Sequence, residues 1–345
     1  MRIPPFLRDG GTIGFLAPSF GCATEPYQSL FNNALRKFQA MGYQTKLGPN
    51  CYASSGFGIS NTPENCGQEL NDSYLDPESD VLISCGGGEM MCEVVPYMDF
   101  DAIKAAAPKW YMGFSDNTNF TFLSATLADT AAIYGPCAGA FGMEPWDVSL
   151  SDAFALLTGR EKHSHGYPLW QLESERSEEN PFAPYQLQKK TRYRKFDPQG
   201  RERGTIRMEG RLLGGCLDCL ANLQGTRFDR VADFNRRYGH EGVLWFLEAC
   251  DLNVLDMRRT LWRMKNAGWF DCASGFLIGR PLHYREEIMG LDQYEAVLCH
   301  LKDFGVPILM DLDIGHLPPM MPLVTGAHAS VKCRYSRIEI AYSEL

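Results

Sequence analysis

A serine stands where a strand-to-helix turn is expected. Residues 113–118 read Gly-Phe-Ser-Asp-Asn-Thr after an apolar run, which places Ser115 on the turn. A glycine permits a sharp bend, and the first N–H groups of the helix supply partial positive charge where an oxyanion would form. The spacing departs from G-x-S-x-G because Asn117 replaces the second glycine. Ser115 fits a nucleophile, and it also fits a simple helix N-cap.

Two further polar residues lie at the ends of expected strands. Glu248 follows the apolar run Val243–Leu247, and His316 lies in a loop beyond residues 307–310. A catalytic triad needs a hydroxyl, an imidazole that takes its proton, and a carboxylate that orients the imidazole. Ser115, His316 and Glu248 could fill these roles. The alternatives are a solvated or capping glutamate and a structural histidine.

A glycine run offers backbone donors for the same chemistry. Gly86–Gly88 follow a buried strand and precede a helix, so the N–H of Gly87 could bind an oxyanion together with that of Asp116. The glycine run does not match a dinucleotide-binding loop, because Met91 occupies the position of the last glycine in G-x-G-x-x-G. A tight turn without a ligand remains the alternative.

Other motifs favour structural roles. The single Cys-x-x-Cys motif, at 216–219, has no second pair at a zinc-like distance, and this indicates core thiols. The His-x-His at 163–165 could bind a metal or substrate but fits a solvated surface better. The Asp-x-Asp at 311–313 could bind a cation or brace the His316 loop. We therefore predict no metal and no cofactor.

The first half of the chain alternates strands and helices. This order predicts a doubly wound, mostly parallel sheet with catalytic groups at the carboxyl ends of its strands. The expected strands are 12–17, 43–47, 80–84, 109–114 and 132–134, and the expected helices are 27–41, one from 62, 89–98, and one from 115 to about 129.

The composition changes after Gly159. Residues 160–205 are rich in charged residues, serine and proline and are interpreted as a linker or active-site loop between domains 1–159 and 206–345. In the second domain we expect a helix after Gly215, strands at 242–247, 275–278, 307–310, 329–333 and 337–341, and helices at 254–267 and 291–304.

The length, composition and net charge of the chain limit the classes of protein to which it can belong. The chain has 345 residues, of which 45% are hydrophobic, and this suits two domains. Its net charge of −9 and lack of a long basic run argue against nucleic acid as a partner. It has no apolar run long enough to span a membrane and no signal-like N-terminus, and its 12 cysteines are scattered. We expect a cytoplasmic protein with reduced thiols.

Together the motifs resemble the LD-carboxypeptidase family of serine peptidases, which includes the microcin C immunity hydrolases. The resemblance rests on GTIGFLAPS at 11–19, the glycines at 86–88, GFSDNT at 113–118, GRLLGG at 210–215, FLE at 246–248 and GH at 315–316. It implies Ser115 as nucleophile, Glu248 and His316 as its partners, and oxyanion donors at Gly87 and Asp116. It also implies a flavodoxin-like N-terminal sheet, a smaller C-terminal α/β domain and homodimers.

One feature departs from the pattern of the family, and another departs from its shorter murein-cleaving members. Gly88 stands where the family often has a side chain, which affects the adjoining substrate subsite. The long 160–204 segment resembles the immunity branch, where aromatic residues of this loop are associated with a nucleotide-like group, and Trp170 is the candidate here.

The sequence thus predicts a serine hydrolase that cleaves an amide bond near a free carboxylate. The preferred substrate is a murein tetrapeptide ending in D-alanine. One alternative is self-immunity through hydrolysis of a peptidyl or aminoacyl nucleotide, and another is a non-catalytic ligand-binding module.

Overall fold

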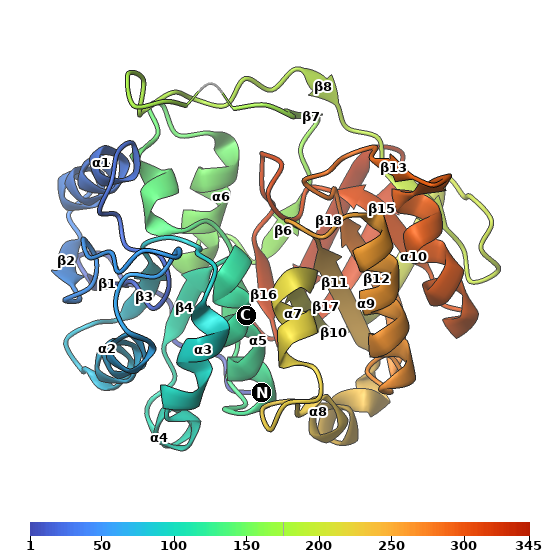
Figure 1. The fold of residues 1–345 in the computed structure, drawn as a ribbon, viewed down its shortest axis with the longest axis horizontal. Helices are drawn as coiled ribbons and strands as arrows, with labels where there is room; N and C mark the ends of the chain where they lie inside the picture. The colour runs from blue at the N-terminus through green and yellow to red at the C-terminus, as the bar shows by residue number, and fades with distance from the viewer. Residues whose placement is uncertain (175) are drawn as a thin grey trace. The chain divides into compact units, whose positions relative to one another are not determined.

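The computed structural model describes residues 1–174 and 176–345, which form two compact units. The first unit comprises residues 1–161, 173–186 and 322–324, and the second comprises residues 162–172, 187–321 and 325–345. Each unit has its own large β-sheet, as Figure 1 shows. The segment 160–204 therefore contributes to both units.

The sheet of the first unit has the strand order of a flavodoxin-like fold. Its order is β2-β1-β3-β4-β5, with β16 added beside β5, and β1 to β5 pair in parallel. The predicted doubly wound sheet is confirmed. The strands are β1 (Thr12–Leu16), β2 (Gln44–Leu47), β3 (Val81–Ser84), β4 (Trp110–Gly113), β5 (Ala132–Tyr134) and β16 (Leu323–Thr325).

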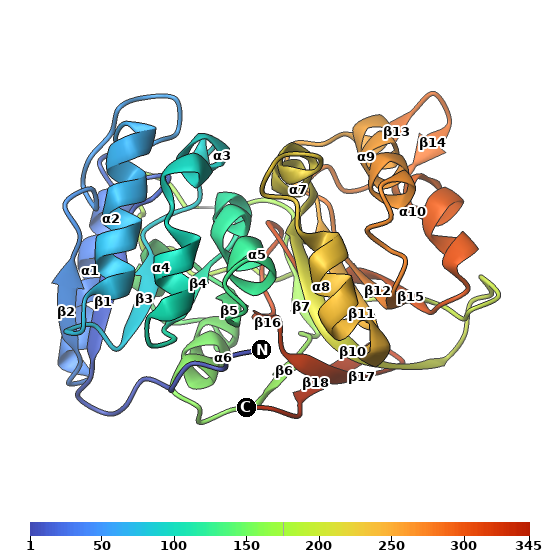
Figure 2. The ribbon, with the colours of Figure 1, turned by 90° about the horizontal axis from the view of Figure 1, so that it is seen from below.

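Helices cover both faces of this sheet. On one face Phe38 of α1 (Tyr27–Ala40) packs 5.5 Å from Phe154 of α6 (Val148–Leu157), measured between ring centroids. Figure 2 shows α2 (Pro63–Leu75), α4 (Phe100–Ala105) and α5 (Thr118–Thr126) together over the other face. The predicted helix at 89–98 is shorter than expected. It consists of α3 (Met91–Val94) and a 3-10 turn at Val95–Tyr97, because Pro96 cannot occupy a helix interior.

The second unit contains a mixed eight-stranded sheet in the order β6-β18-β17-β10-β11-β12-β15-β9. The four neighbouring strands β10, β11, β12 and β15 are parallel to one another. The main strands are β10 (Thr205–Cys216), β11 (Val243–Glu248), β12 (Ala273–Gly279), β15 (Ile308–Leu312), β17 (His328–Arg334) and β18 (Arg337–Tyr342). The helices are α7 (Leu217–Leu223), α8 (Val231–Tyr238), α9 (Val254–Asn266) and α10 (Gln293–Leu301). Strand β10 and helix α8 were not predicted.

The segment 160–204 contains short strands that were not predicted either. Strand β6 (His163–His165) pairs with β18 at one edge of the second sheet, and β9 (Arg194–Phe196) pairs with β15 at the other. Strands β7 (Leu169–Trp170) and β8 (Lys189–Lys190) form a separate two-stranded ribbon. Their pairing partners are distant in sequence, so local periodicity gives no signal for them.

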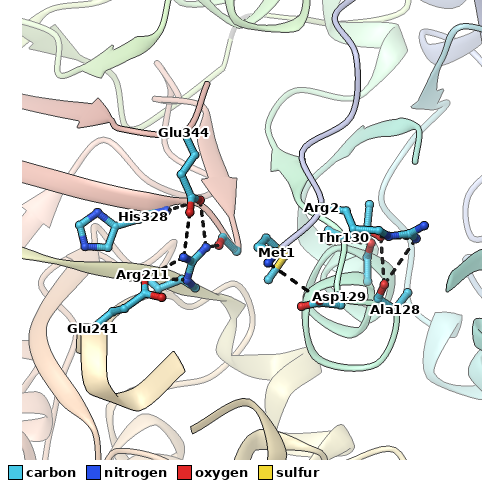
Figure 3. Close-up of polar contacts among 11 residues, drawn as sticks. Met1, Arg2, Ala128, Asp129, Thr130, Arg211, Glu241, His328 and Glu344 are labelled. Carbon is cyan, nitrogen blue, oxygen red and sulfur yellow. Dashed lines mark hydrogen bonds and ion pairs between the residues drawn. The ribbon is translucent and has the colours of Figure 1, made fainter. Parts of the chain in front are cut away.

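Buried or partly buried charges anchor the chain ends within each unit. In the second unit, the Arg211 guanidinium lies 2.7 Å from Glu241 Oε2 and 2.9 Å from Glu344 Oε1, and so it ties β10 to the C-terminal residues (Figure 3). In the first unit, Arg2 Nη2 donates to Thr130 Oγ1 at 2.6 Å. Among the helices of the described residues, none combines the length and apolar character needed to cross a bilayer.

Candidate active site

Ser115 begins a strained turn directly beyond the end of β4. Its φ of 61° lies in the left-handed region, which a non-glycine residue adopts only when the surroundings enforce it. Its N–H donates to Tyr134 Oη at 3.2 Å. Neither the 3-10 helix at Ser115–Asn117 nor α5 has Ser115 as its N-cap residue. The turn has the strained strand-to-helix geometry that exposes a nucleophile in hydrolases.

Asn117 explains why the motif lacks its second glycine. Its Nδ2 donates to Gly86 O at 2.8 Å and to Phe114 O at 3.0 Å, and its Oδ1 accepts a hydrogen bond from Tyr111. A Cβ at Gly113 would lie 2.9 Å from Asn117 Cβ, so only glycine fits at this position. In the sequence Asn117 is only a departure from G-x-S-x-G, and its role in tying the serine turn to the glycine run was not predicted.

The glycine run lies directly beside Ser115. A Cβ at Gly87 would lie 3.1 Å from Ser115 Cβ and 3.2 Å from its Oγ. The Gly87 carbonyl accepts from Phe20 N at 2.8 Å, whereas its N–H has no acceptor among the residues that the structure describes. Gly88 adopts a φ of 129°, and a Cβ there would lie 2.1 Å from Ser19 Oγ, so a side chain cannot be accommodated. The Gly87 donor is thus within reach of a group bound at Ser115.

The Asp116 side chain holds this turn in place. Its buried carboxylate accepts from Ser19 Oγ at 2.5 Å, from Met91 N at 2.8 Å and from Asn119 Nδ2 at 3.0 Å. These bonds connect the turn to the loop after β1 and to the start of α3. The carboxylate is therefore engaged in structure, and any contribution of Asp116 to binding an oxyanion must come from its backbone N–H.

In the second unit, Glu248 and His316 are hydrogen-bonded to each other. His316 Nδ1 lies 2.9 Å from Glu248 Oε2, and Glu248 is the last residue of β11 and is fully buried. Two glycines make room for this carboxylate. A Cβ at Gly315 would lie 2.5 Å from Glu248 Oε2, and one at Gly279 would lie 3.0 Å from Glu248 Cβ. The alternative of a solvated glutamate does not fit its burial.

The glutamate changes the basicity of the imidazole. Burial by itself lowers the pKa of His316, but the charge of Glu248 and hydrogen bonds to Glu248 and Cys250 outweigh it and hold the pKa well above its usual value. A histidine placed in this way retains its proton on Nδ1 and presents Nε2 as the base. This arrangement suits an imidazole that takes a proton from a hydroxyl.

Cys250 and Asp218 support the histidine and were not anticipated. Burial raises the pKa of the Cys250 thiol, and the neighbouring His316 partly opposes this. The Asp218 carboxylate accepts the N–H groups of Cys250 at 3.1 Å and Asp251 at 2.9 Å, which fixes the loop after β11. Asp218 lies inside the Cys-x-x-Cys motif, for which core thiols were predicted and no role for Asp218.

The Asp-x-Asp motif braces the His316 loop. Asp313 forms a buried ion pair with Arg280 and accepts from Tyr193 Oη at 2.5 Å. Asp311 accepts from Gln293 Nε2 at 2.9 Å and from Tyr294 Oη at 2.8 Å. Within residues 1–174 and 176–345, no group of three or more His, Cys, Asp or Glu side chains has the geometry to hold a metal ion.

Trp170 lies in the β7–β8 ribbon of the second unit. Its ring is 4.9 Å from the ring of Tyr284 and 4.8 Å from Arg280 Cζ, and only 4% of the residue is exposed. It lines a cavity whose other walls are mostly basic. Of the predicted site residues, the structure thus brings Glu248 to His316 in the second unit and Gly87 to Ser115 and its neighbour Asp116 in the first, whereas Gly88 lies against Ser19, Phe20 and Gly58.

Two family models match the chain, one in each half. The LD-carboxypeptidase N-terminal domain matches residues 13–135, and the LD-carboxypeptidase C-terminal domain matches residues 209–331. Ser115 and the glycine run fall in the first match, and Glu248 and His316 fall in the second.

Individual relatives agree with these matches. The microcin C7 self-immunity protein MccF of Escherichia coli is 26% identical over 342 residues, which is 96% of this chain and 93% of that protein. The murein tetrapeptide carboxypeptidase of Pseudomonas aeruginosa is 23% identical over 264 residues, which is 74% of this chain and 71% of that protein.

Solved structures have the same fold. The structure of MccF in complex with aspartyl sulfamoyl adenosine matches with a TM-score of 0.82 at 24% identity and covers 100% of both chains. An MccF-like protein from Bacillus anthracis matches with a TM-score of 0.82 at 20% identity, over 99% of this chain and 100% of that chain.

Proposed function

This chain belongs to the LD-carboxypeptidase family, and on that premise we propose that it is a serine-type hydrolase that cleaves an amide bond near a free carboxylate. Ser115 acts as the nucleophile, His316 as the general base and Glu248 as the group that orients His316. The observation that carries the proposal is the buried Glu248–His316 hydrogen bond of 2.9 Å. The left-handed turn of Ser115 beside Gly87 supports it.

The proposed reaction passes through an acyl-enzyme. Ser115 Oγ attacks the amide carbonyl carbon while His316 Nε2 takes the hydroxyl proton, and Glu248 stabilises the resulting imidazolium. The N–H groups of Gly87 and Asp116 donate to the oxyanion. When the C–N bond breaks, His316 returns its proton to the leaving amine. A water molecule, deprotonated by His316, then attacks the ester, and the acid product and Ser115 are released.

The first substrate that we propose is a murein tetrapeptide with a terminal D-alanine. Its support is the family itself and the murein tetrapeptide carboxypeptidase among the relatives. The Ser115 site requires no metal for this reaction, since the proposed nucleophile is activated by an imidazole. We also propose that the protein acts as a homodimer, which light scattering can test.

A second candidate substrate is a peptidyl or aminoacyl nucleotide. The alignment with the microcin C7 self-immunity protein extends over 96% of this chain and supports this candidate. A further support is the position of Trp170 on the wall of a basic cavity. In this proposal the Ser-His-Glu chemistry is unchanged and only the leaving group differs.

One purified preparation tests both substrates. We expect turnover of a murein tetrapeptide or of an aminoacyl sulfamoyl adenosine, and loss of that turnover in Ser115→Ala. Ser151→Ala, at an exposed position on α6, is the matched control and should retain activity. Wild-type turnover by Ser115→Ala would remove the nucleophile assignment. Failure of the wild type on both substrates would favour the non-catalytic binding module.

A further inference from the structure

A cavity of about 540 Å³ lies entirely within the second unit, and its walls are basic. This volume is in the range of small-molecule sites, about 300–1,000 Å³. The cavity is bordered by the β7–β8 ribbon and by residues that follow β12. Among the described residues that line it, Asp311 is the only acidic one, and six are basic, namely Lys189, Lys190, Arg192, Arg194, Arg280 and Arg285.

Two of the six cations are neutralised by carboxylates. Arg280 pairs with Asp313, and Arg194 Nε lies 2.7 Å from Glu202 Oε1. The Asp311 carboxylate is engaged by neutral donors instead, namely the side chains of Gln293 and Tyr294. It therefore forms no ion pair with a cation of the cavity.

The other four cations have no carboxylate partner among the described residues. Within the described part of the chain, no carboxylate lies at ion-pair distance from Lys189, Lys190, Arg192 or Arg285. Some exposed cations of the chain are paired, as at Lys46, whose Nζ lies 2.7 Å from Asp76 Oδ2, whereas these four lie together around one cavity. Four uncompensated like charges around one cavity repel each other, and a bound anion would relieve this repulsion.

The scaffold that carries these cations is ordered. Strand β8 pairs with β7, and this places Lys189 opposite Trp170 and Lys190 opposite Leu169. The Trp170 ring is fixed between Tyr284 and Arg280, and Lys189 Nζ lies 5.7 Å from its centroid. Arg285 Cζ lies 5.4 Å from the ring of Tyr284. The rings of Trp170 and Tyr284, with Lys189 and Arg285 beside them, are thus held in place by contacts within the chain.

We propose that this cavity binds an oligophosphate group, that is, two or three linked phosphates carried by a small molecule. A single phosphoryl or sulfamoyl linkage carries at most about one negative charge, which would leave most of the four cations uncompensated. An oligophosphate carries several charges and offers oxygen pairs that suit the bidentate geometry of Arg192 and Arg285. The binding does not depend on amide hydrolysis.

The test uses inorganic tripolyphosphate as the probe, titrated calorimetrically into the full chain. We expect one site per chain, with affinity that falls as salt is added and exceeds that for orthophosphate at least tenfold. The same binding is expected in Ser115→Ala, so a failure of the hydrolase proposal would not affect this result. Absence of tripolyphosphate binding would overturn the proposal.

Matched variants locate the site. The triple variant Lys190→Gln, Arg192→Gln and Arg285→Gln should weaken tripolyphosphate binding at least tenfold. The control carries Arg207→Gln, Arg227→Gln and Lys332→Gln, which remove the same charge from exposed positions of the same unit, and it should bind as the wild type does. Circular dichroism confirms that each variant is folded. Equal binding by the two triple variants would overturn the assignment.

Kinetics distinguish the two sources of an oligophosphate. If the group belongs to the substrate, tripolyphosphate should raise the KM of a substrate that carries phosphates and leave the turnover of an unphosphorylated peptide unchanged. If the group belongs to a free nucleotide that acts as an effector, tripolyphosphate should change the turnover of the unphosphorylated peptide as well.

Discussion

His316 Nδ1 lies 2.9 Å from Glu248 Oε2. Glu248 is the last residue of a buried strand, and His316 lies in a loop 68 residues later. The carboxylate is inaccessible to solvent and His316 is nearly so, with 14% of its side chain exposed. A buried glutamate without a cationic or hydrogen-bonding partner would be costly. The pairing therefore stabilises the charged forms of both groups, and it determines how the imidazole titrates.

We expect Glu248→Gln to lower the pKa of His316. In the wild type the charge of Glu248 raises this pKa, so the neutral base forms only at a pH above the ordinary value of about 6.5. The acid limb of the kcat/KM profile should therefore shift to lower pH in Glu248→Gln, while the maximal rate falls. NMR titration of the His316 ring and the pH profile measure both effects. An unchanged titration would contradict the prediction.

The same pKa shift predicts how stability depends on pH. Because the pKa of His316 is higher in the folded than in the unfolded state, its contribution to stability is fully present below the unfolded pKa of about 6.5. This contribution is lost as the pH rises through the folded pKa. Denaturant unfolding at a series of pH values measures this effect. Over this interval, the free energy of unfolding should depend less on pH in Glu248→Gln than in the wild type.

Gly315→Ala should disrupt the pair without altering either partner. The new Cβ would lie 2.5 Å from Glu248 Oε2, at a φ of 104° that disfavours a side chain. We expect a loss of stability above 2 kcal/mol, roughly the sum of backbone strain and displacement of a buried carboxylate, and a large loss of kcat/KM. Gly290→Ala is the control, since its φ is 79° but nothing lies within 4 Å of the new Cβ. It should cost about 1 kcal/mol and retain activity.

The strain at Ser115 predicts a trade-off between stability and activity. Both Ser115→Ala and Ser115→Gly remove the hydroxyl and should be inactive. Only glycine relieves the left-handed φ of 61°, so we expect Ser115→Gly to be about 1 kcal/mol more stable than Ser115→Ala. Equal unfolding midpoints in urea would show that the turn stores no such strain.

Much of the first unit could be predicted because its signals are local. The apolar run of β3 and the Thr62–Pro63 start of α2 are visible in a few consecutive residues, and the structure places both as expected. The end of α3 was predicted wrongly because the helical pattern continues through Pro96, whereas the α-helix ends at Val94. Local sequence patterns thus predicted the order of the helices and strands better than the residues at which they end.

The second unit was harder because its pairings are long-range. Strand β10 alternates buried and exposed residues only in its first half and is then buried throughout, a mixture that matches no single period. Strands β6 and β9 are short and pair with residues more than 100 positions away. Likewise, the contact of Cys250 with His316 has no sequence motif, whereas the Glu248 and His316 candidates came from their positions at strand ends.

Asn117 offers a test of how the serine turn is held. Replacing it by alanine removes its bonds to the carbonyls of Gly86 and Phe114 and leaves the hydroxyl of Tyr111 without its acceptor. An unsatisfied buried group costs about 1–3 kcal/mol, so Asn117→Ala should be destabilised by at least this amount. Because the lost bonds join the Ser115 turn to the glycine run, kcat should also fall while the hydroxyl itself is retained.

A matched asparagine separates the effect on stability from the effect on activity. Asn71 also uses its side chain to bond backbone groups, with Nδ2 donating to Tyr97 O at 2.9 Å and Oδ1 accepting from Asp99 N at 2.9 Å, but it lies on α2 and touches neither the turn nor the glycine run. Asn71→Ala should therefore lose stability and keep its kcat at temperatures where it is folded. If Asn117→Ala also kept its kcat, the bond between Asn117 and Gly86 would serve folding alone, and the position of Gly87 beside Ser115 would have to be set by the strands that precede both segments.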